Sequence, residues 1–345
     1  MTQFYRVYNE HQIPVLADTS EPQSVDFLGS FKEKIHIDII SKNQEEIVFD
    51  LIGVDASVAN ALRRILLAEI PTVAIERVWF SANSGIIQDE VLAHRVGLVP
   101  LKVDPRKLDF VQKNPETGED DETDADTLVL HLNVHFPQGH SADSDAVSGS
   151  TSVAPTGEVL AKHLVWLPIG GQSEAFPEGV APVHPDIVLA KLRPGQHIEF
   201  EAHAWKGIGK DHAKFSPVAT AAYRLLPDVS IPTDITGEEA KELVQMCPMK
   251  VFDIEDLGKP AKNSVSTGGK AVVARARDCT MCRECIRKEG WAEKVQLRRK
   301  ADHFIFSVES TGALSPEELV REAISILKDK STKFSRIMSA PANEG

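Results

Sequence analysis

One amphipathic segment with both ends marked constrains this chain more than any other feature. Residues 54–71 read VDASVANALRRILLAEIP. Asp55 is of a type whose side chain accepts a backbone N–H at the start of a helix, and Pro71 prevents the helix from continuing. Between them four apolar side chains recur at helical spacing on one face: Val58, Leu62, Ile65 and Leu66. The segment is therefore predicted to be a helix that buries this face.

The residues of this helix also resemble a known family. The string NALRRILL (residues 60–67) is similar to the signature helix of the alpha subunits of cellular RNA polymerases, above all to the larger alpha-like subunits shared by eukaryotic polymerases I and III. In that family the helix forms half of a dimer interface, so the resemblance implies that the apolar face meets a partner. It also implies that Arg63 and Arg64 lie toward the second-largest polymerase subunit, although adjacent helical residues point about 100° apart.

Two later strings resemble the same family. Residues 92–101 read LAHRVGLVPL, and residues 207–218 read GIGKDHAKFSPV. The first is predicted to lie in a short helix that Asp89 caps and that Gly97, in the left-handed conformation, ends. The second is not a phosphate-binding loop, because that loop has four residues between its glycines and a Ser or Thr after its Lys. In the family the second string lies against other polymerase subunits.

The end of the chain is predicted to return to the domain of the first helix. Residues 304–308 alternate as a strand, and residues 315–318, SPEE, form a capping box with Pro at the first helical position. The string SVESTGALSPEE (residues 307–318) resembles the same family again. A second apolar stripe follows: Leu319, Val320, Ala323, Ile324, Ile326 and Leu327. By resemblance, the expected dimer interface consists of Val58, Leu62, Ile65, Leu66, Leu319, Ala323, Ile324 and Leu327.

Alternating apolar residues predict strands through much of the chain. Isoleucines at alternate positions in residues 35–39, and apolar residues at alternate positions in residues 47–51, predict a hairpin with these side chains facing inward. Further strands are predicted at residues 73–80, 128–136, 159–167, 187–192 and 197–204. The acidic run within residues 116–126 is predicted to be a solvated, mobile loop, because its like charges repel. Residues 141–157, rich in Ser, Asp, Ala and Gly, are predicted to be a flexible insertion.

The four cysteines indicate metal chemistry. Cys279, Cys282 and Cys285 are spaced as in a bacterial two-cluster ferredoxin, where a fourth cysteine, followed by Pro, ligates the other cluster. Glu289 stands at that fourth position, but Cys247 precedes a Pro elsewhere in the chain. Archaeal relatives carry a ferredoxin-like domain here, while many eukaryotic ones have lost the cysteines. The spacing leaves three alternatives open: one 4Fe-4S cluster, one zinc ion, or four free thiols.

Composition excludes several classes of protein. Lys and Arg number 38 against 51 Asp and Glu, a net charge of -13, which argues against a chain that coats nucleic acid. No run of eighteen apolar residues exists and the N-terminus lacks the apolar core of a signal peptide, so no membrane span and no secretion are expected. Three of the four cysteines crowd together, which disfavours a disulfide framework. An intracellular protein is expected and, by resemblance, one of the nucleolus and nucleoplasm.

The sequence thus predicts an α+β protein with a discontinuous dimerisation domain. The expected parts are an N-terminal arm (1–30), a dimerisation domain in two pieces (31–83 and 296–345), an inserted mostly-β domain (84–230) and a ferredoxin-like insertion with the cysteines (231–295). The resemblance implies a non-catalytic scaffold subunit of DNA-directed RNA polymerases I and III, which make rRNA, 5S rRNA and tRNA. Its implied partners are a smaller alpha-like subunit, the two largest subunits and small zinc-binding subunits, with little or no contact to nucleic acid.

Two other classes of function compete with this interpretation. An iron–sulfur electron carrier would explain the cysteine spacing, but the cysteines supply one site rather than two and occupy a small part of the chain. A stand-alone nucleic-acid-binding module would need a basic surface with interleaved aromatic residues, which the acidic composition does not provide.

Overall fold

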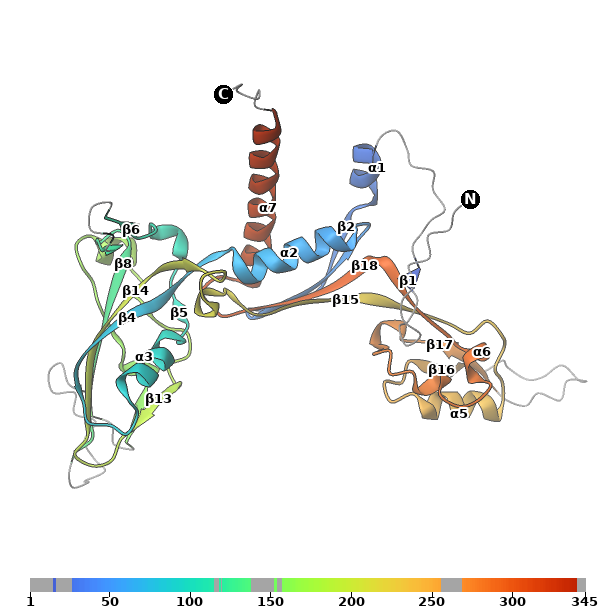
Figure 1. Ribbon diagram of the computed structural model, residues 1–345. Helices are drawn as coiled ribbons and strands as arrows, with labels where there is room; N and C mark the ends of the chain where they lie inside the picture. Colours follow the sequence, from blue (N-terminus) through green and yellow to red (C-terminus); the bar gives the residue numbers. More distant parts are fainter. Residues whose placement is uncertain are drawn as a thin grey trace, which may run out of the picture. The chain divides into compact units, whose positions relative to one another are not determined.

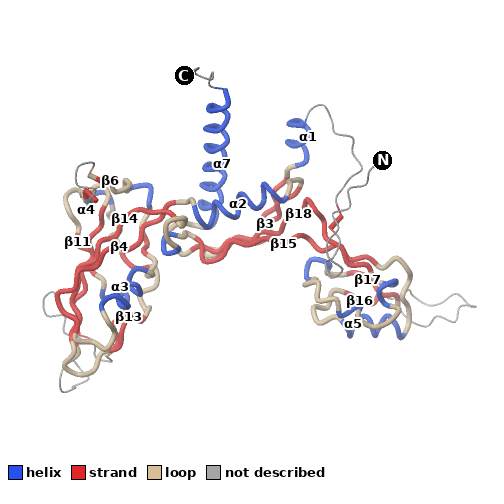
Figure 2. Tube along the Cα trace, viewed as in Figure 1, coloured by secondary structure: helices blue, strands red, loops and turns tan. Residues whose placement is uncertain are grey.

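The computed structural model describes residues 15–16, 27–114, 118, 120–137, 152–153, 157–255 and 269–339 of the 345-residue chain. The chain forms two compact units. Unit 1 comprises residues 1–40, 48–59 and 223–306, and unit 2 comprises residues 41–47, 60–222 and 307–345. Helices and strands occur in both units (Figure 2), so the predicted mixture of α and β structure is confirmed.

The elements follow one another along the chain as labelled in Figure 1. The helices are α1 (Phe27–Lys34), α2 (Ala56–Ala68), α3 (Asp89–Gly97), α4 (Gln172–Ala175), α5 (Glu238–Met246), α6 (Trp291–Lys294) and α7 (Pro316–Ser339). The longer strands are β2 (His36–Lys42), β3 (Glu46–Ile52), β4 (Pro71–Asn83), β8 (Thr127–His135), β13 (Val188–Lys191), β14 (His197–Ile208), β15 (Val218–Ser230), β16 (Phe252–Glu255), β17 (Lys270–Val273) and β18 (Gln296–Ser310). The short ones are β1 (Val15–Leu16), β5 (Leu101–Lys102), β6 (Gln112–Lys113), β7 (Asp120–Asp121), β9 (Ser152–Val153), β10 (Glu158–Leu160), β11 (Val165–Leu167) and β12 (Ala181–Pro182).

Unit 1 contains most of a five-stranded sheet. Its strands run in the order β1-β18-β3-β2, and β15 also pairs with β18. Phe49 of β3 and Phe306 of β18 are buried, and their rings stack with centroids 5.1 Å apart. The predicted hairpin of β2 and β3 is confirmed, but its isoleucines do not face a core, because all seven residues of β2 are exposed. That expectation was wrong because β2 is an edge strand that no described residue covers.

A smaller core in unit 1 belongs to the cysteine-bearing region. Strands β16 and β17 pair antiparallel, and α5 packs beside them. The residues that these elements and α6 bury together include Ala240, Leu243, Cys247, Phe252, Ala271, Cys285 and Trp291. Two of the four cysteines thus belong to the core that holds this small region together.

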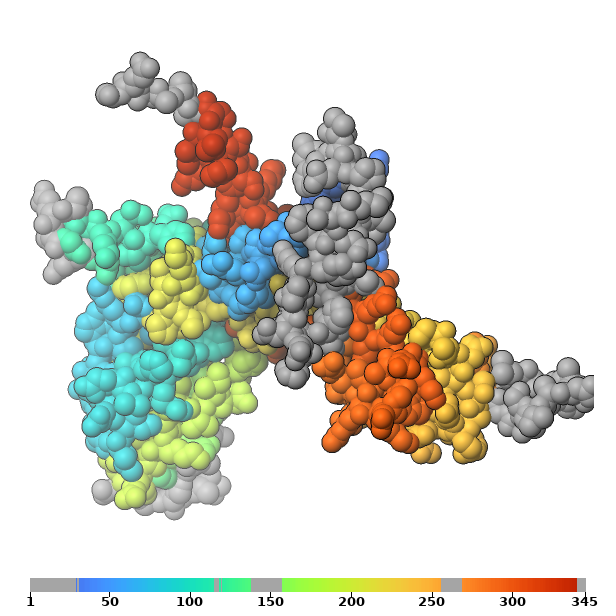
Figure 3. Space-filling model, turned by 45° about the vertical axis from the view of Figure 1, so that its right-hand side comes forward, coloured from blue at the N-terminus to red at the C-terminus, as the bar shows by residue number. Residues whose placement is uncertain are grey.

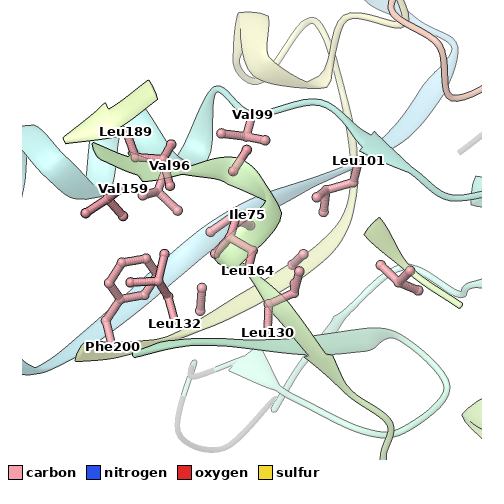
Figure 4. Close-up of a cluster of buried hydrophobic side chains, with 14 of the residues drawn as sticks. Ile75, Val96, Val99, Leu101, Leu130, Leu132, Val159, Leu164, Leu189 and Phe200 are labelled. Carbon is pink, nitrogen blue, oxygen red and sulfur yellow. The ribbon is translucent and has the colours of Figure 1, made fainter. Parts of the chain in front are cut away.

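The mostly-β part of unit 2 is an antiparallel sheet of β11, β8, β14 and β4, with β9 paired parallel to β8. Leu128, Leu130, Leu132 and Val134 of β8 have no exposed surface, which confirms the predicted inward face. They meet apolar residues of β14, α3 and β13 in one cluster (Figure 4). This cluster is the hydrophobic core of the mostly-β part of unit 2.

Two strand predictions in this region need correction. The strand predicted at residues 159–167 is interrupted by a short 3-10 helix, Ala161–His163, between β10 and β11. The side chain of His163 accepts the backbone N–H of Leu160 at 3.1 Å, which stabilises that interruption. Strand β15 was missed because its buried positions do not alternate regularly and it contains Pro227. None of the described helices is both long and apolar enough to cross a membrane.

Candidate functional site: an assembly surface and a cysteine cluster

Helix α2 begins and ends where the sequence predicts. The carboxylate of Asp55 accepts the backbone N–H of Ser57 at 2.8 Å, and the Asp55 carbonyl accepts that of Val58 at 3.0 Å. These bonds satisfy donors that the first turn of a helix leaves open. The helix ends at Ala68, and Pro71 opens β4.

The eight residues expected at the dimer interface divide into two groups. The first group is buried in the chain itself, at most 6% exposed: Leu62, Ile65, Leu66, Leu319 and Ala323. In the second group, Val58 and Leu327 are half-buried and Ile324 is 46% exposed. The first group therefore builds the chain's own core, and only the second presents apolar surface to a partner.

The two arginines of α2 differ in their freedom. Arg63 is half-buried, and its guanidinium donates to the side-chain oxygen of Asn60, one turn earlier, at 3.0 and 3.2 Å. Arg64 is exposed and makes no hydrogen bond or ion pair with any described residue. Of the pair, Arg64 is the one whose charge is available to another protein.

The family-like string at residues 207–218 is fastened to the end of α2. The backbone N–H of Lys210 donates to the Ala68 carbonyl at 2.9 Å. A Cβ on Gly209 would lie 2.2 Å from the Leu67 carbonyl oxygen, so only glycine allows the loop to approach the helix this closely. On the following strand, the Thr72 hydroxyl donates to the Phe215 carbonyl at 2.6 Å. The string therefore has a structural role, which explains Gly209.

Two cations of the family-like strings are also used inside unit 2. The Lys214 side chain is 11% exposed, donates to the Ile75 carbonyl at 2.8 Å and pairs with Glu76. A nearly buried ammonium needs such partners to offset its lost hydration. On α3, the Arg95 guanidinium donates to the Leu189 carbonyl of β13 at 2.9 Å. These contacts bind the 207–218 string to β4 and α3 to β13.

Helix α3 differs from the prediction at both ends. Its N-cap is Gln88, which makes no side-chain cap, while Asp89 is already helical and accepts from the Asn83 amide at 2.7 Å. Gly97 is the last helical residue and is not left-handed. A Cβ at Gly97 would lie 3.2 Å from the Ile75 carbonyl oxygen, so the glycine serves close packing against β4 rather than a turn.

The described part of the acidic run is not a free loop. Arg77 pairs with Asp120 and, at 2.9 Å, with Glu122. His203 contacts Glu122 through one ring nitrogen and Glu201 through the other, at 3.1 Å. The prediction of a mobile segment was therefore wrong for residues 120–122, because β4 and β14 supply partners that the local sequence does not show. Residues 115–117 and 119 lie outside the described residues, as do residues 141–151 of the predicted insertion.

The structure brings all four cysteines to one small pocket in unit 1. Cys247 and Cys285 are buried, Cys279 is half-buried and Cys282 is exposed, and all line the same hollow. The backbone N–H of Val251 donates to the Cys247 sulfur at 3.4 Å. The sequence grouped Cys247 with the other three cysteines only because it precedes a Pro, as the fourth cysteine of a ferredoxin motif does. Its position in the same pocket supports that grouping.

Burial raises the pKa of two of these thiols, Cys279 and Cys285. Burial raises the pKa of the Cys285 thiol to about 12, and the neighbouring sulfurs of Cys279, Cys247 and Cys282 add to the rise. Burial likewise raises the pKa of Cys279, again with a contribution from the other sulfurs, while Arg224 opposes it. Without a cation, burial therefore favours the neutral form of the Cys279 and Cys285 thiols, whereas a bound metal favours thiolates.

Backbone conformation singles out the same loop. In the described chain, the three residues other than glycine with positive φ are Lys250, Met281 and Arg283, at 53°, 59° and 67°. All three flank the cysteines in sequence. Such conformations cost energy and cluster at ligand-binding loops. These positions of positive φ therefore lie beside the cysteines in sequence.

The donor set fits a metal, although the side chains are not arranged around one. Four sulfurs are the complement of a four-cysteine zinc site and of a four-iron cluster. Among the described residues, however, no three His, Cys, Asp or Glu side chains already converge closely enough to hold an ion. The residues would therefore have to turn toward a common centre on binding.

A hydrogen-bonded triad around a buried aspartate ties the cysteine loop to the five-stranded sheet. Asp50 of β3 accepts two hydrogen bonds of 2.7 Å from Arg277, and a third of 2.8 Å from His303 of β18. Burial raises the pKa of Asp50, but the bonds from Arg277 and His303 outweigh it and leave that pKa below its ordinary value. Arg277 lies two residues before Cys279, so its position fixes the start of the cysteine loop.

Comparison with known proteins identifies the family. A family model described as the RNA polymerase Rpb3/Rpb11 dimerisation domain matches residues 48–331. The chain belongs to this family. The resemblance drawn from the sequence strings is thereby confirmed.

Rpb3/Rpb11-family relatives match over most of their length. A Dictyostelium discoideum protein named DNA-directed RNA polymerases I and III subunit rpac1 is 46% identical over 306 residues, 88% of this chain and 81% of the relative. A human protein named DNA-directed RNA polymerases I and III subunit RPAC1 is 44% identical, over 88% of this chain and 84% of the relative. A Dictyostelium discoideum protein named DNA-directed RNA polymerase II subunit rpb3 is 34% identical, over 86% and 92%.

For a member of the Rpb3/Rpb11 dimerisation family, the uncovered apolar residues of α7 are the most informative. Phe334, Ile337 and Met338 are 65%, 62% and 71% exposed and lie near the C-terminal end of α7, the red helix in Figures 1 and 3. The sequence-based prediction missed them, because it followed the stripe only as far as Leu327. The signal was present, since Phe334 follows Leu327 by seven residues, two helical turns along the same face.

Proposed function

We propose that this chain is the larger alpha-like subunit of RNA polymerases I and III, a scaffold on which the large catalytic subunits assemble. The observation that carries the proposal is the 44–46% identity, along 88% of the chain, to subunits named for these two polymerases. The relative named for polymerase II is 34% identical, which favours polymerases I and III. The chain then works in the nucleus, with polymerase I in the nucleolus and polymerase III in the nucleoplasm.

Purification from native cells tests this assignment. The tagged chain is isolated in physiological salt and the co-purifying proteins are identified by mass spectrometry. We expect the two largest subunits of polymerases I and III, one smaller alpha-like subunit and the small zinc-binding subunits. Recovery of polymerase II subunits in their place, or of no polymerase subunit, would contradict the assignment.

We place the contact with the smaller alpha-like subunit on the exposed apolar residues of α7. Four apolar residues of this helix are at least 46% exposed: Ile324, Phe334, Ile337 and Met338. Toward the N-terminal end of the same helix, the apolar residues Leu319 and Ala323 are buried. One end of α7 thus packs in the core of this chain, and the other end exposes apolar side chains. Obligate interfaces are rich in apolar residues, so we expect a partner subunit to cover the exposed end. Leu66 is unsuited to test this, because it is wholly buried and its replacement by Asp would unfold the chain.

A pair of nearby substitutions tests the interface. Phe334→Asp places a charge in the exposed stripe, whereas Thr332→Asp places the same charge about 160° away, on the polar side of the helix, where residue 332 is also exposed. In co-expression and pull-down, Phe334→Asp should lose the smaller subunit and Thr332→Asp should retain it. Retention by both variants, with the chain folded by circular dichroism, would remove α7 from the interface.

Contacts with the large subunits are assigned to α2 and α3. Arg64 is exposed and without a partner among the described residues, and Arg63 stands beside it. On α3 and at its C-cap, Val91 and Leu98 are 51% and 50% exposed, although Arg95 ties that helix to β13. We assign Arg64 and Arg63 to the second-largest subunit and the α3 surface to a further subunit.

This chain supplies no catalytic group in our proposal. The two buried carboxylates of the described chain are both used structurally. Asp50 accepts hydrogen bonds from Arg277 and His303. Asp126 accepts hydrogen bonds from the Thr123 backbone N–H at 2.9 Å and from the hydroxyls of Thr123 and Thr127. Neither is free to bind the Mg²⁺ that nucleotide transfer requires. The enzyme's chemistry is then left to other subunits.

We propose that the cysteine cluster is a structural metal site. Cys247, Cys279, Cys282 and Cys285 would ligate either one 4Fe-4S cluster or one zinc ion, which would tie the cysteine loop to the core of α5 and α6. Anaerobic purification with analysis of iron, sulfide and zinc decides between them. Neither metal at stoichiometric level would leave four free thiols.

The iron–sulfur electron carrier proposed as an alternative is not supported. The relatives are named as polymerase subunits, and the family model spans residues 48–331 rather than the cysteine region alone.

A further inference from the structure

The free end of α7 has a charge opposite to that of the whole chain. Residues 328–339 read KDKSTKFSRIMS, with four basic side chains and one acidic, whereas the net charge of the chain is -13. The preceding residues of the helix, 316–327, carry three glutamates and one arginine. The basic half is the half whose side chains are all exposed.

The position of these cations around the helix is informative. At about 100° per residue, Lys328 lies roughly 120° to one side of Phe334 and Lys333 roughly 100° to the other side. They therefore border the exposed stripe of Phe334, Ile337 and Met338. Arg336 lies about 160° from Phe334, on the polar side of the helix.

Most of this charge is not used within the chain. Lys330 pairs with Glu69 at 2.7 Å. The side chains of Lys328, Lys333 and Arg336 make no hydrogen bond or ion pair with any residue that the structure describes. Stabilisation of the helix dipole explains Arg336, which lies in the last turn, but not Lys328, eleven residues before the end at Ser339.

We propose that the smaller alpha-like partner covers this stripe with an acidic amphipathic helix whose carboxylates face Lys328 and Lys333. This inference rests on the proposed function, because it takes α7 as part of the interface with that partner. Charges that border an apolar seam set which helices pair. A second copy of this chain would bring like charges together across the seam, so the same residues oppose a homodimer.

Single charge reversals test the proposal. The affinity of the full chain for the fluorescently labelled smaller alpha-like subunit is measured at about 50 mM and about 500 mM salt. Lys328→Glu and Lys333→Glu should each weaken binding roughly fivefold to tenfold at low salt and about twofold or less at high salt. Arg336→Glu is the matched control, since it makes the same change of charge away from the seam, and it should cost about twofold or less at either salt.

The outcomes separate this inference from the function on which it rests. Equal losses for Lys333→Glu and Arg336→Glu, or losses that salt does not reduce, would overturn the acidic partner helix while leaving the pair itself intact. Failure of the wild-type chain to bind the smaller subunit would overturn both. Self-association of the wild-type chain that Phe334→Asp abolishes would also overturn the inference, because it would show that like charges do not prevent pairing.

Discussion

Loss of the Asp50 carboxylate should detach the cysteine loop from the five-stranded sheet. Asp50 is 5% exposed and accepts three hydrogen bonds of 2.7–2.8 Å, two from Arg277 and one from His303. Removing one partner of a buried pair costs about 3–5 kcal/mol, because the other charge stays buried without compensation. The Arg277 side chain is 32% exposed, so water compensates part of that loss. We expect Asp50→Asn to lower the free energy of unfolding by roughly 2–3 kcal/mol.

The assay is chemical denaturation of the heterodimer together with hydrogen exchange of residues 275–285. Asp278→Asn is the control, because Asp278 is exposed and lies next to Arg277. It should change stability by about 0.5 kcal/mol or less. If Asp50→Asn costs no more than Asp278→Asn, or if exchange in the cysteine loop is unchanged, the triad does not hold the loop.

The pH dependence of the same contact has a definite sign. The pKa of Asp50 is lowered in the folded chain, because the hydrogen bonds from Arg277 and His303 together outweigh its burial. A carboxylate with a depressed pKa contributes stability above its unfolded pKa and loses it as the pH falls through the lower, folded value. The difference between wild type and Asp50→Asn should therefore be constant near neutral pH and shrink only below the ordinary carboxyl range.

Three further predictions concern assembly and packing. Arg64→Ala should leave the pair with the smaller subunit intact and weaken recruitment of the second-largest subunit in pull-downs, more than Arg63→Ala, since Arg63 is engaged with Asn60. Gly209→Ala should destabilise the chain by roughly 1–3 kcal/mol in thermal denaturation, because the added Cβ would lie 2.2 Å from a carbonyl oxygen. Gly171→Ala is the control and should be tolerated, because no atom lies within 4 Å of a Cβ added there. Cys285→Ser should abolish binding of any iron or zinc and increase hydrogen exchange in the cysteine loop. RNA synthesis by the assembled polymerase should stay within about twofold of wild type, because a structural site does not take part in catalysis. A complete loss of synthesis with assembly intact would contradict a structural role.

Much of the fold could be predicted where the signal is local. The ends of α2 follow from Asp55 and Pro71. The capping box at α7 is observed as well: the Glu318 backbone N–H donates to the Ser315 hydroxyl, and the Ser315 backbone N–H donates to the Glu318 carboxylate, both at 3.3 Å. Strand β8 follows from strict alternation. In each case the residues that decide the structure are neighbours in sequence.

The remainder depends on residues far apart in the chain. The packing role of Gly97 requires the carbonyl of Ile75, and the anchoring of residues 120–122 requires Arg77 and His203. No local pattern shows these contacts. The exposure of β2 was missed for a related reason: alternation shows that a face is apolar but not whether this chain or another covers it.

The uncovered strand β2 has a consequence for the cell. Its isoleucines at positions 37, 39 and 40, with Ile35 just before it, are 38–59% exposed, and β2 is the last strand in its sheet. An apolar edge strand of this kind pairs readily with other chains and promotes aggregation. A molecule made in excess of its partners would therefore be held by chaperones or degraded. The amount of this subunit should then follow the supply of its partners rather than its own rate of synthesis, so that the polymerases receive it in matched numbers.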